Sequence, residues 1–253
     1  MTCICIIPAR YASTRFPGKP LALLAGKPII QHVYEHAAQC VHHTYVATDN
    51  RLIYDAVTQF GGHAIMTSTQ HQSGTERLME ALGKIDAMDI PWDVAVNLQG
   101  DEPFVGPNHI HALCRCFETD ASVEIATLVA RIKTQSDLDN INVPKVIINR
   151  QHEAVYFSRS TIPYIRNVQK EEWLAHYPFM KHIGLYAFSK NALQKISTLA
   201  LSPLEEMEKL EQLRWIENGL KIKTAVVEDA TIGIDTPEDL RKAEAYIKAK
   251  LTK

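Results

Sequence analysis

Three basic residues lie close together near the start of the chain. Arg10, Arg15 and Lys19 fall within residues 8–20, and no acidic residue lies between them. A bound phosphate would gain up to about 4 kcal/mol per close charge at an effective dielectric near 20, before desolvation costs. Without an anion the three charges would only repel one another. We therefore predict an anion-binding loop here, with a solvated surface loop as the alternative.

The basic loop matches neither of two common phosphate-binding motifs. It contains neither GxxxxGK[ST] nor GxGxxG, which argues against a P-loop kinase and a dinucleotide-dependent dehydrogenase. An acid beside such a loop would indicate a metal-bound phosphate, and Asp101 in NLQGDEP (97–103) is the first candidate. The alternative is an ordinary turn acid, because Gly-Asp is common in turns.

A second carboxylate occurs in GIDTPEDL (233–240). There Thr236 suits a helix N-cap, Pro237 the first helical position and Asp239 the return partner of a capping box. Asp235 has no such role, so it could share a metal with Asp101, unless it only favours the helix dipole. Mg²⁺ is typically held by one or two carboxylates together with phosphate oxygens and water. These motifs are therefore compatible with a magnesium site at Asp101 and Asp235, with favourable placement of Asp235 at the helix dipole as the alternative.

A third motif, HQSGTER (71–77), combines a glycine and hydroxyls with Arg77. Its backbone could read the edge of a base and Arg77 could anchor it. The same stretch also fits the start of a helix capped by Ser73. VATDN (46–50) is similar and more typical of a structural turn.

The elements expected to position these motifs form βαβ units. We predict strands at residues 3–7, 44–48, 64–66, 94–98 and 125–131, with helices at 29–40, 50–60, 75–84 and 108–118. Ligands bind at the carboxyl ends of such strands, and in the common strand order the first and fourth strands are neighbours. The turn at 97–103 should then lie beside the basic loop.

The middle of the chain has a different pattern, with strand-like pieces at 145–148, 154–157 and 183–188. These predict an antiparallel insertion. A helix at 203–218, a strand at 224–228 and a helix from Pro237 should follow. Because no linker or repeat is visible, we predict a single domain over 1–253, with a lid or dimerisation insertion at about 140–190.

Composition limits the function classes. The 253 residues are 46% hydrophobic and 22% charged, which is ordinary globular usage. The net charge of −2 lacks the global basic footprint of nonspecific nucleic-acid binding, and no run approaches the ~20 apolar residues of a membrane span. We expect a cytoplasmic protein without nucleic-acid partners or membrane insertion. Five cysteines, an odd number, predict packed, reduced thiols rather than a disulfide framework.

Together these motifs resemble one family, the 3-deoxy-manno-octulosonate cytidylyltransferases, also called CMP-Kdo synthetases. The resemblance extends from residue 8 to residue 240 and is specific because the motifs occur together and in order. They are PARYASTRFPGKP, VATDN, HQSGTER, NLQGDEP, YFSRSTIPYIR, KHIGLY, SPLEEMEKLEQLR and GIDTPEDL.

The resemblance implies a three-layer α/β/α nucleotidyltransferase (Rossmann-like) fold with a mixed, mostly parallel sheet, and usually a homodimer. It implies transfer of CMP from CTP to the anomeric hydroxyl of 3-deoxy-D-manno-octulosonate (Kdo), with Mg²⁺, for lipopolysaccharide biosynthesis. The residues it implies for the nucleotide and the catalytic site are Arg10, Arg15, Lys19, Ser73, Arg77 and Gln99, with Asp101 and Asp235 as the metal ligands. Those it implies for the sugar are Gln99, Arg159, His182, Tyr186, Glu211 and Gln212.

Two other functions are compatible with these features. A cytidylyltransferase for another sugar acid, such as sialic acid, would differ mainly in the amino-acid sequences of the loops and of the helix around Glu211. A non-catalytic nucleotide sensor could keep the same fold. Retention of both candidate metal acids and of all three basic loop residues argues against the sensor.

Overall fold

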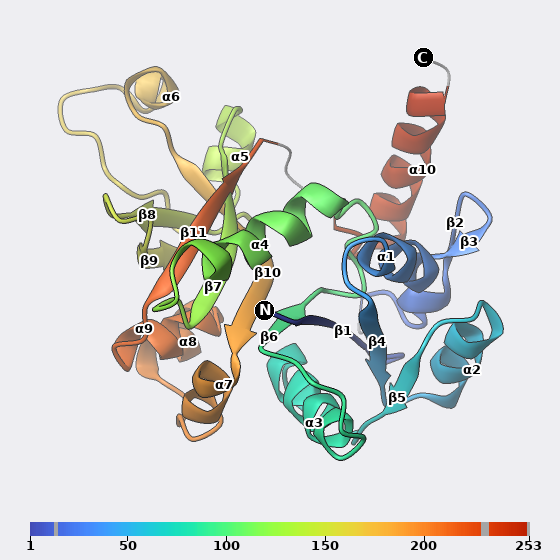
Figure 1. The fold of residues 1–253 in the computed structure, drawn as a ribbon. Coiled ribbons are helices and arrows are strands. Elements are labelled where there is room, and N and C mark those ends of the chain that lie inside the picture. The colour runs from blue at the N-terminus through green and yellow to red at the C-terminus, as the bar shows by residue number, and fades with distance from the viewer. Residues whose placement is uncertain (13–14, 229–232, 252–253) are drawn as a thin grey trace. The chain divides into compact units, whose positions relative to one another are not determined.

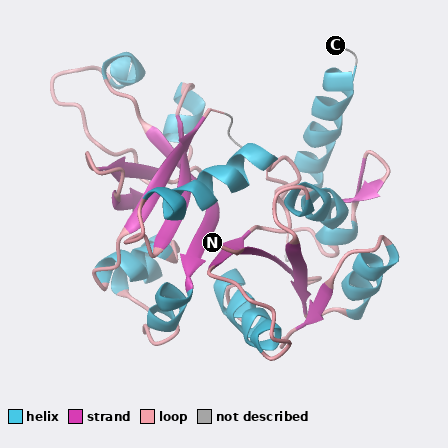
Figure 2. Ribbon diagram, viewed as in Figure 1, coloured by secondary structure: helices cyan, strands magenta, loops and turns pink. Residues whose placement is uncertain are grey.

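The structure, a computed structural model, describes residues 1–12, 15–228 and 233–251. Its residues pack into two compact units, one formed by 1–111 with 231–253 and the other by 112–230. The single-domain organisation with a lid or dimerisation insertion stays a prediction. The ribbon and its helices and strands are drawn in Figures 1 and 2.

The first unit contains four parallel strands. β1 (Cys3–Ala9) pairs with β4 (His43–Thr48) on one side and with β6 (Val94–Asn97) on the other, and β5 (Ala64–Met66) pairs with β4. The centre of β1, residues 4–7, is completely buried, as expected for a strand covered on both faces. The predicted adjacency of the first and fourth strands is confirmed, because β6 is the fourth predicted strand.

Helices pack against these strands (Figure 1). α1 buries Ile29, Ile30, Val33 and Ala37, a set at helical spacing, and α2 begins after an N-cap by Asn50. The bounds are α1 (Ile29–Ala38), α2 (Arg51–Gln59), α3 (Gly74–Asp86) and α10 (Pro237–Leu251), with a 3₁₀ turn at Lys19–Leu21 and a small hairpin of β2 (Leu23–Leu24) and β3 (Lys27–Pro28). α4 (Pro107–Thr119) continues the chain into the second unit.

The second unit is built around β7 (Ile125–Arg131). It pairs in parallel with β11 (Ile222–Val227) and antiparallel with β10 (Met180–Ser189). β8 (Lys145–Ile148) pairs antiparallel with β10 and with β9 (Ala154–Ser158). The predicted antiparallel strands are therefore present, and the α/β class with a mixed, mostly parallel sheet is confirmed.

One predicted helix is wrong. Residues 203–218 form two helices, α8 (Pro203–Glu208) and α9 (Gln212–Glu217), rather than one. The chain reverses at Lys209, whose φ of 51° is left-handed and ends α8. Residues 203–218 are rich in charged side chains and contain no glycine, so the sequence does not indicate a left-handed turn at this point. We call Lys209–Glu211 the elbow.

Three short helices of the second unit were not predicted from the sequence. They are α5 (Gln135–Asp139), α6 (Trp173–His176) after a 3₁₀ turn at Lys170–Glu172, and α7 (Lys190–Ile196). Each has at most seven residues, too few for a clear apolar period. None of the five cysteines, all of which lie within the described residues, forms a disulfide. Within the described ranges, no helix has both the length and the apolar character needed to cross a membrane.

Candidate active site

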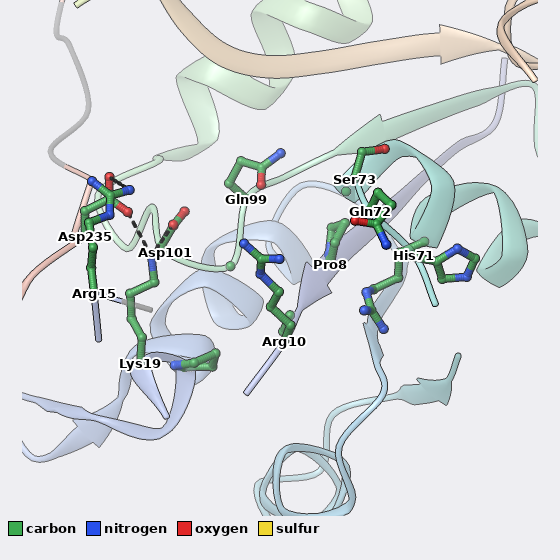
Figure 3. A pocket seen from close by; sticks show the side chains of 15 residues that line it. Pro8, Arg10, Arg15, Lys19, His71, Gln72, Ser73, Gln99, Asp101 and Asp235 are labelled. Carbon is green, nitrogen blue, oxygen red and sulfur yellow. Dashed lines mark hydrogen bonds and ion pairs between the residues drawn. The ribbon is translucent and has the colours of Figure 1, made fainter. Parts of the chain in front are cut away.

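One pocket in the first unit brings together eight residues that the sequence predicted for the nucleotide and the metal. Its volume is about 310 Å³. Its walls come from the loop after β1, the start of α3, the turn after β6 and the segment before α10 (Figure 3). The eight residues are Arg10, Arg15, Lys19, Ser73, Arg77, Gln99, Asp101 and Asp235.

The basic loop turns back toward the sheet at Gly18. This residue has a φ of 70°, and its N–H donates to the Tyr11 carbonyl at 3.0 Å. A Cβ at Gly18 would lie 3.2 Å from the Tyr11 ring, so both conformation and space favour glycine. Lys19 follows at the start of a 3₁₀ turn and lines the pocket. Ser13 and Thr14, also in this loop, lie outside the described residues.

Asp101 reaches the pocket because the turn after β6 approaches β1 closely. A Cβ at Gly100 would lie 3.0 Å from the Pro8 carbonyl oxygen, so a larger residue would push the turn away. The carbonyl of Asp101 accepts a hydrogen bond from the Ile234 N–H at 2.9 Å. This bond connects the turn to the segment that carries Asp235.

Asp235 precedes α10, and the predicted capping box is confirmed. The Thr236 hydroxyl accepts from the Asp239 N–H at 3.2 Å, and the Asp239 carboxylate accepts from the Thr236 N–H at 3.0 Å. The carboxylate of Asp235 takes no part in the cap and lies in the pocket instead.

The acids and bases of the pocket form ion pairs. Lys19 Nζ lies 2.5 Å from Asp101 Oδ2 and 3.0 Å from Asp235 Oδ1, and Arg15 Nη2 lies 3.1 Å from Asp235 Oδ2. The expectation that the basic residues would only repel one another without an anion is therefore wrong. Two carboxylates from distant parts of the sequence neutralise two of the charges.

Arg77 belongs to the wall of the pocket and is 4% exposed. Its Nη2 donates to Asp49 Oδ2 at 2.7 Å, and its Nη1 donates to Thr67 Oγ1 at 2.6 Å. Ser73 caps α3 by accepting from the Glu76 N–H at 3.1 Å. Arg77 thus connects α3 to the ends of β4 and β5, with Asp49 as its counter-ion.

His71 also lines the pocket, although the sequence assigned it no role. Its Nε2 contacts the Glu80 carboxylate, which also accepts from the Ser68 N–H at 2.8 Å and pairs with Lys84 at 2.7 Å. Burial opposes ionisation of Glu80, but hydrogen bonds from Lys84, Ser68 and His71 outweigh it and lower its pKa to about 2. An ionised Glu80 only accepts, so Nε2 of His71 is the donor in this contact.

Predicted sugar residues of the second unit cluster along β10 and α9. His182 Nε2 lies 3.0 Å from Thr127 Oγ1, and the rings of His182 and Tyr186 have centroids 5.4 Å apart. Burial lowers the pKa of His182 to about 3, so its imidazole is neutral. Burial, with the charge of Glu211, raises the pKa of Tyr186 well above its ordinary value.

Unpaired polar atoms are buried in the same cluster. Among the residues with described positions, Tyr186 Oη, Gln212 Nε2 and Trp215 Nε1 have no hydrogen-bond partner. Buried polar groups are usually paired, and leaving one unpaired costs about 1–3 kcal/mol. Tyr186 and Gln212 belong to the predicted sugar set, and Trp215 lay outside it.

Arg159 is engaged with the protein backbone. Its guanidinium donates to the carbonyls of Glu208 at 2.7 Å, Ile141 at 3.1 Å and Lys209 at 3.3 Å. The Glu208 carboxylate accepts in return from the Arg159 N–H at 2.9 Å. Arg159 therefore stabilises the elbow that precedes Gln212. Contact of Arg159 with a sugar carboxylate stays a prediction.

Comparison with known proteins gives consistent matches. The sequence model described as "Cytidylyltransferase" matches residues 4–222. Proteins named 3-deoxy-manno-octulosonate cytidylyltransferase are 53% identical in Parabacteroides distasonis, covering 98% of both chains, and 52% in Bacteroides thetaiotaomicron, covering 96% of this chain and 97% of the relative. A solved structure of CMP:2-keto-3-deoxy-manno-octonic acid synthetase complexed with CTP has a TM-score of 0.90 at 41% identity, covering 99% of this chain and 100% of that one.

Proposed function

The chain belongs to the family of 3-deoxy-manno-octulosonate cytidylyltransferases, and we propose that it transfers CMP from CTP to the anomeric hydroxyl of Kdo. The products would be CMP-Kdo and pyrophosphate, for lipopolysaccharide biosynthesis. Within the structure, the observation that carries the proposal is the pocket where Arg10, Arg15 and Lys19 meet Asp101 and Asp235. That set of charges suits a metal-bound triphosphate.

The chemistry is an in-line displacement at phosphorus. The anomeric hydroxyl loses its proton to solvent and its oxygen forms a bond to the α-phosphorus of CTP. The bond from that phosphorus to the bridging oxygen breaks, and pyrophosphate leaves with the electron pair. Such transfers depend mainly on positioning and on neutralising charge. Arg15 and Lys19 would stabilise the departing pyrophosphate, and Arg10 would help to hold the triphosphate.

The acids of the pocket fit a magnesium ion. Carboxylate oxygens of Asp101 and Asp235 converge on a single cationic atom, Lys19 Nζ, at 2.5 and 3.0 Å, so both reach one cation position. Over the described part of the chain, no group of three or more His, Cys, Asp or Glu side chains is placed to hold a metal. The two acids would thus hold Mg²⁺ together with phosphate oxygens and water. When bound, Mg²⁺ supplies charge that neutralises the phosphates.

The second unit supplies candidate sugar contacts. Tyr186 Oη and Gln212 Nε2 are buried polar atoms without partners, which suits a ligand rich in hydroxyls. His182 would contact the sugar as a neutral imidazole. Arg159 and Glu211 complete this proposed set, and Gln99 would serve from the wall of the nucleotide pocket.

The proposal can be tested by measuring pyrophosphate release. Each of the four nucleoside triphosphates is offered with Kdo, with sialic acid or with no acceptor, and with or without Mg²⁺. We expect release only with CTP, Kdo and Mg²⁺ together. Release with sialic acid instead of Kdo would indicate the rival transferase, and CTP binding without release with any acceptor would indicate a sensor.

Two further expectations from the family stay predictions. We propose a homodimer, which light scattering coupled to gel filtration would detect as twice the chain mass of 28.5 kDa. We also propose a cytoplasmic location, which fractionation of the source cells would test.

A further inference from the structure

The two carboxylates of the pocket share one counter-ion. Lys19 Nζ is within hydrogen-bond distance of both Asp101 and Asp235, and the lysine side chain is only 11% exposed (Figure 3). Of the two acids, Arg15 pairs with Asp235, and its side chain is 65% exposed. The buried ammonium of Lys19 therefore occupies the point at which the two acids meet.

The charges of this group cancel. Lys19 and Arg15 contribute two positive charges, and Asp101 and Asp235 contribute two negative charges. An oxygen lone pair that accepts from the ammonium is not available to a metal, and a divalent cation would be repelled by Lys19 at such short range. As long as Lys19 stays between the acids, its ammonium occupies the point at which their Oδ2 and Oδ1 atoms converge, and the group offers a metal no net negative charge.

We propose that Lys19 closes the metal site of the free protein, and that a divalent metal binds to the two acids only together with the triphosphate. The triphosphate then accepts the ammonium of Lys19 in place of the acids. This inference rests on the proposed function, because it assumes that the pocket binds a metal-bound nucleoside triphosphate.

The charges support this exchange. CTP carries about four negative charges at neutral pH, so its complex with a divalent metal carries about two. This group carries one net positive charge when Arg10 is counted with it, and the charge of Arg77, the other arginine of the pocket wall, is paired with Asp49. The metal–CTP complex therefore restores near-neutrality, whereas the metal alone would add two positive charges. Lysine suits the exchange because its ammonium is carried on a flexible four-carbon stem.

The experiment measures Mn²⁺ binding to the protein without sugar acid, by enhancement of water proton relaxation, which responds to Mn²⁺ on a slowly tumbling protein. Wild type is compared with Lys19→Gln, with Arg15→Gln and with Lys27→Gln. Lys27 is a matched control because it is half-exposed and pairs with Glu35 outside the pocket. A Lys19→Gln/Asp101→Asn double variant tests whether the metal uses the predicted acid.

We expect Lys19→Gln to bind Mn²⁺ at least about tenfold more tightly than wild type in the absence of nucleotide. Arg15→Gln should show a smaller gain and Lys27→Gln none, and the double variant should lose the gain. If Lys19→Gln binds no more tightly than wild type, or gains only as much as Arg15→Gln, the proposal is wrong. Equal gains would mean that removing any positive charge from the pocket raises its affinity for Mn²⁺, whatever the position of that charge.

Two measurements keep the outcome decisive. Circular dichroism checks that Lys19→Gln is folded, and Lys19→Met replaces it if it is not. Wild type should bind Mn²⁺ at least about tenfold more tightly with CTP than without it, and equal affinities would overturn the proposal. Because no acceptor sugar is present, these results do not depend on pyrophosphate release. Failure of the transfer assay and failure of this inference are therefore distinguishable.

Discussion

Replacing Asp49 by alanine removes the counter-ion of a buried guanidinium. Asp49 Oδ2 lies 2.7 Å from Arg77 Nη2, and the two side chains are 17% and 5% exposed. Breaking a buried ion pair by removing one partner costs about 3–5 kcal/mol. Arg77 keeps its bonds to Thr67 and Ser68, and water can reach the site of Asp49 in part. We therefore expect the lower end, about 3 kcal/mol of unfolding free energy.

The assay is urea unfolding at 25 °C followed by circular dichroism. Hydrogen exchange of peptides from the first unit assigns the loss to the region around α3. Asp55→Ala is the matched control, since Asp55 pairs with Arg51 at 2.8 Å on the surface, at 53% and 74% exposure. Such exposed helix pairs contribute only about 0.3–0.5 kcal/mol.

A double variant separates the ion pair from other effects of the substitution. Asp49→Ala with Arg77→Met removes both charges, and replacing a buried pair by apolar groups is often neutral. We expect it to recover most of the stability lost in Asp49→Ala. If Asp49→Ala costs no more than Asp55→Ala, or if the double variant is less stable than Asp49→Ala, Arg77 does not depend on a buried counter-ion.

Three further outcomes are expected. Asp101→Asn should lower kcat by about 100-fold or more at saturating Mg²⁺, and normal turnover would contradict the metal assignment. Glu205→Ala should cost about 3 kcal/mol in denaturant unfolding because Arg214 loses the carboxylate that it binds at 2.5 and 2.7 Å, whereas exposed Glu206→Ala should cost little. Since folding lowers the pKa of His182 from 6.5 to about 3, only the unfolded chain gains its proton between these values. Stability should therefore fall as pH drops below 6.5, by at most about 1.4 kcal/mol per unit, and His182→Gln should flatten this dependence in acid-unfolding curves.

Local patterns were sufficient to predict most of the first unit. The strand at 64–66 has the predicted bounds, and the ends of the other strands of this unit differ from the predicted ones by one or two residues. The capping box of Thr236 and Asp239 was also predictable, because both partners lie within one helical turn. These features depend on neighbours in the sequence, where propensity and periodicity carry information.

Contacts between distant segments were predictable only in part. Adjacency of the first and fourth strands follows from a common strand order, so the approach of Asp101 to the basic loop could be expected. The elbow could not, because Lys209 adopts a left-handed conformation without being glycine. The reversal there lets Arg214 reach Glu205 and brings the Lys209 carbonyl to Arg159.

The pairing of Lys19 shows why residue types alone describe a site incompletely. From residue types, Lys19 is expected to bind the phosphates and the two acids to bind the metal, and no contact between Lys19 and the acids is expected. In the structure the same groups satisfy one another, because a partly buried ammonium is stabilised by nearby carboxylates when no ligand is present. Each group therefore has to exchange one partner for another when the nucleotide binds. The affinity of the pocket for metal and nucleotide must then include the free energy of breaking these ion pairs, which couples the two ligands.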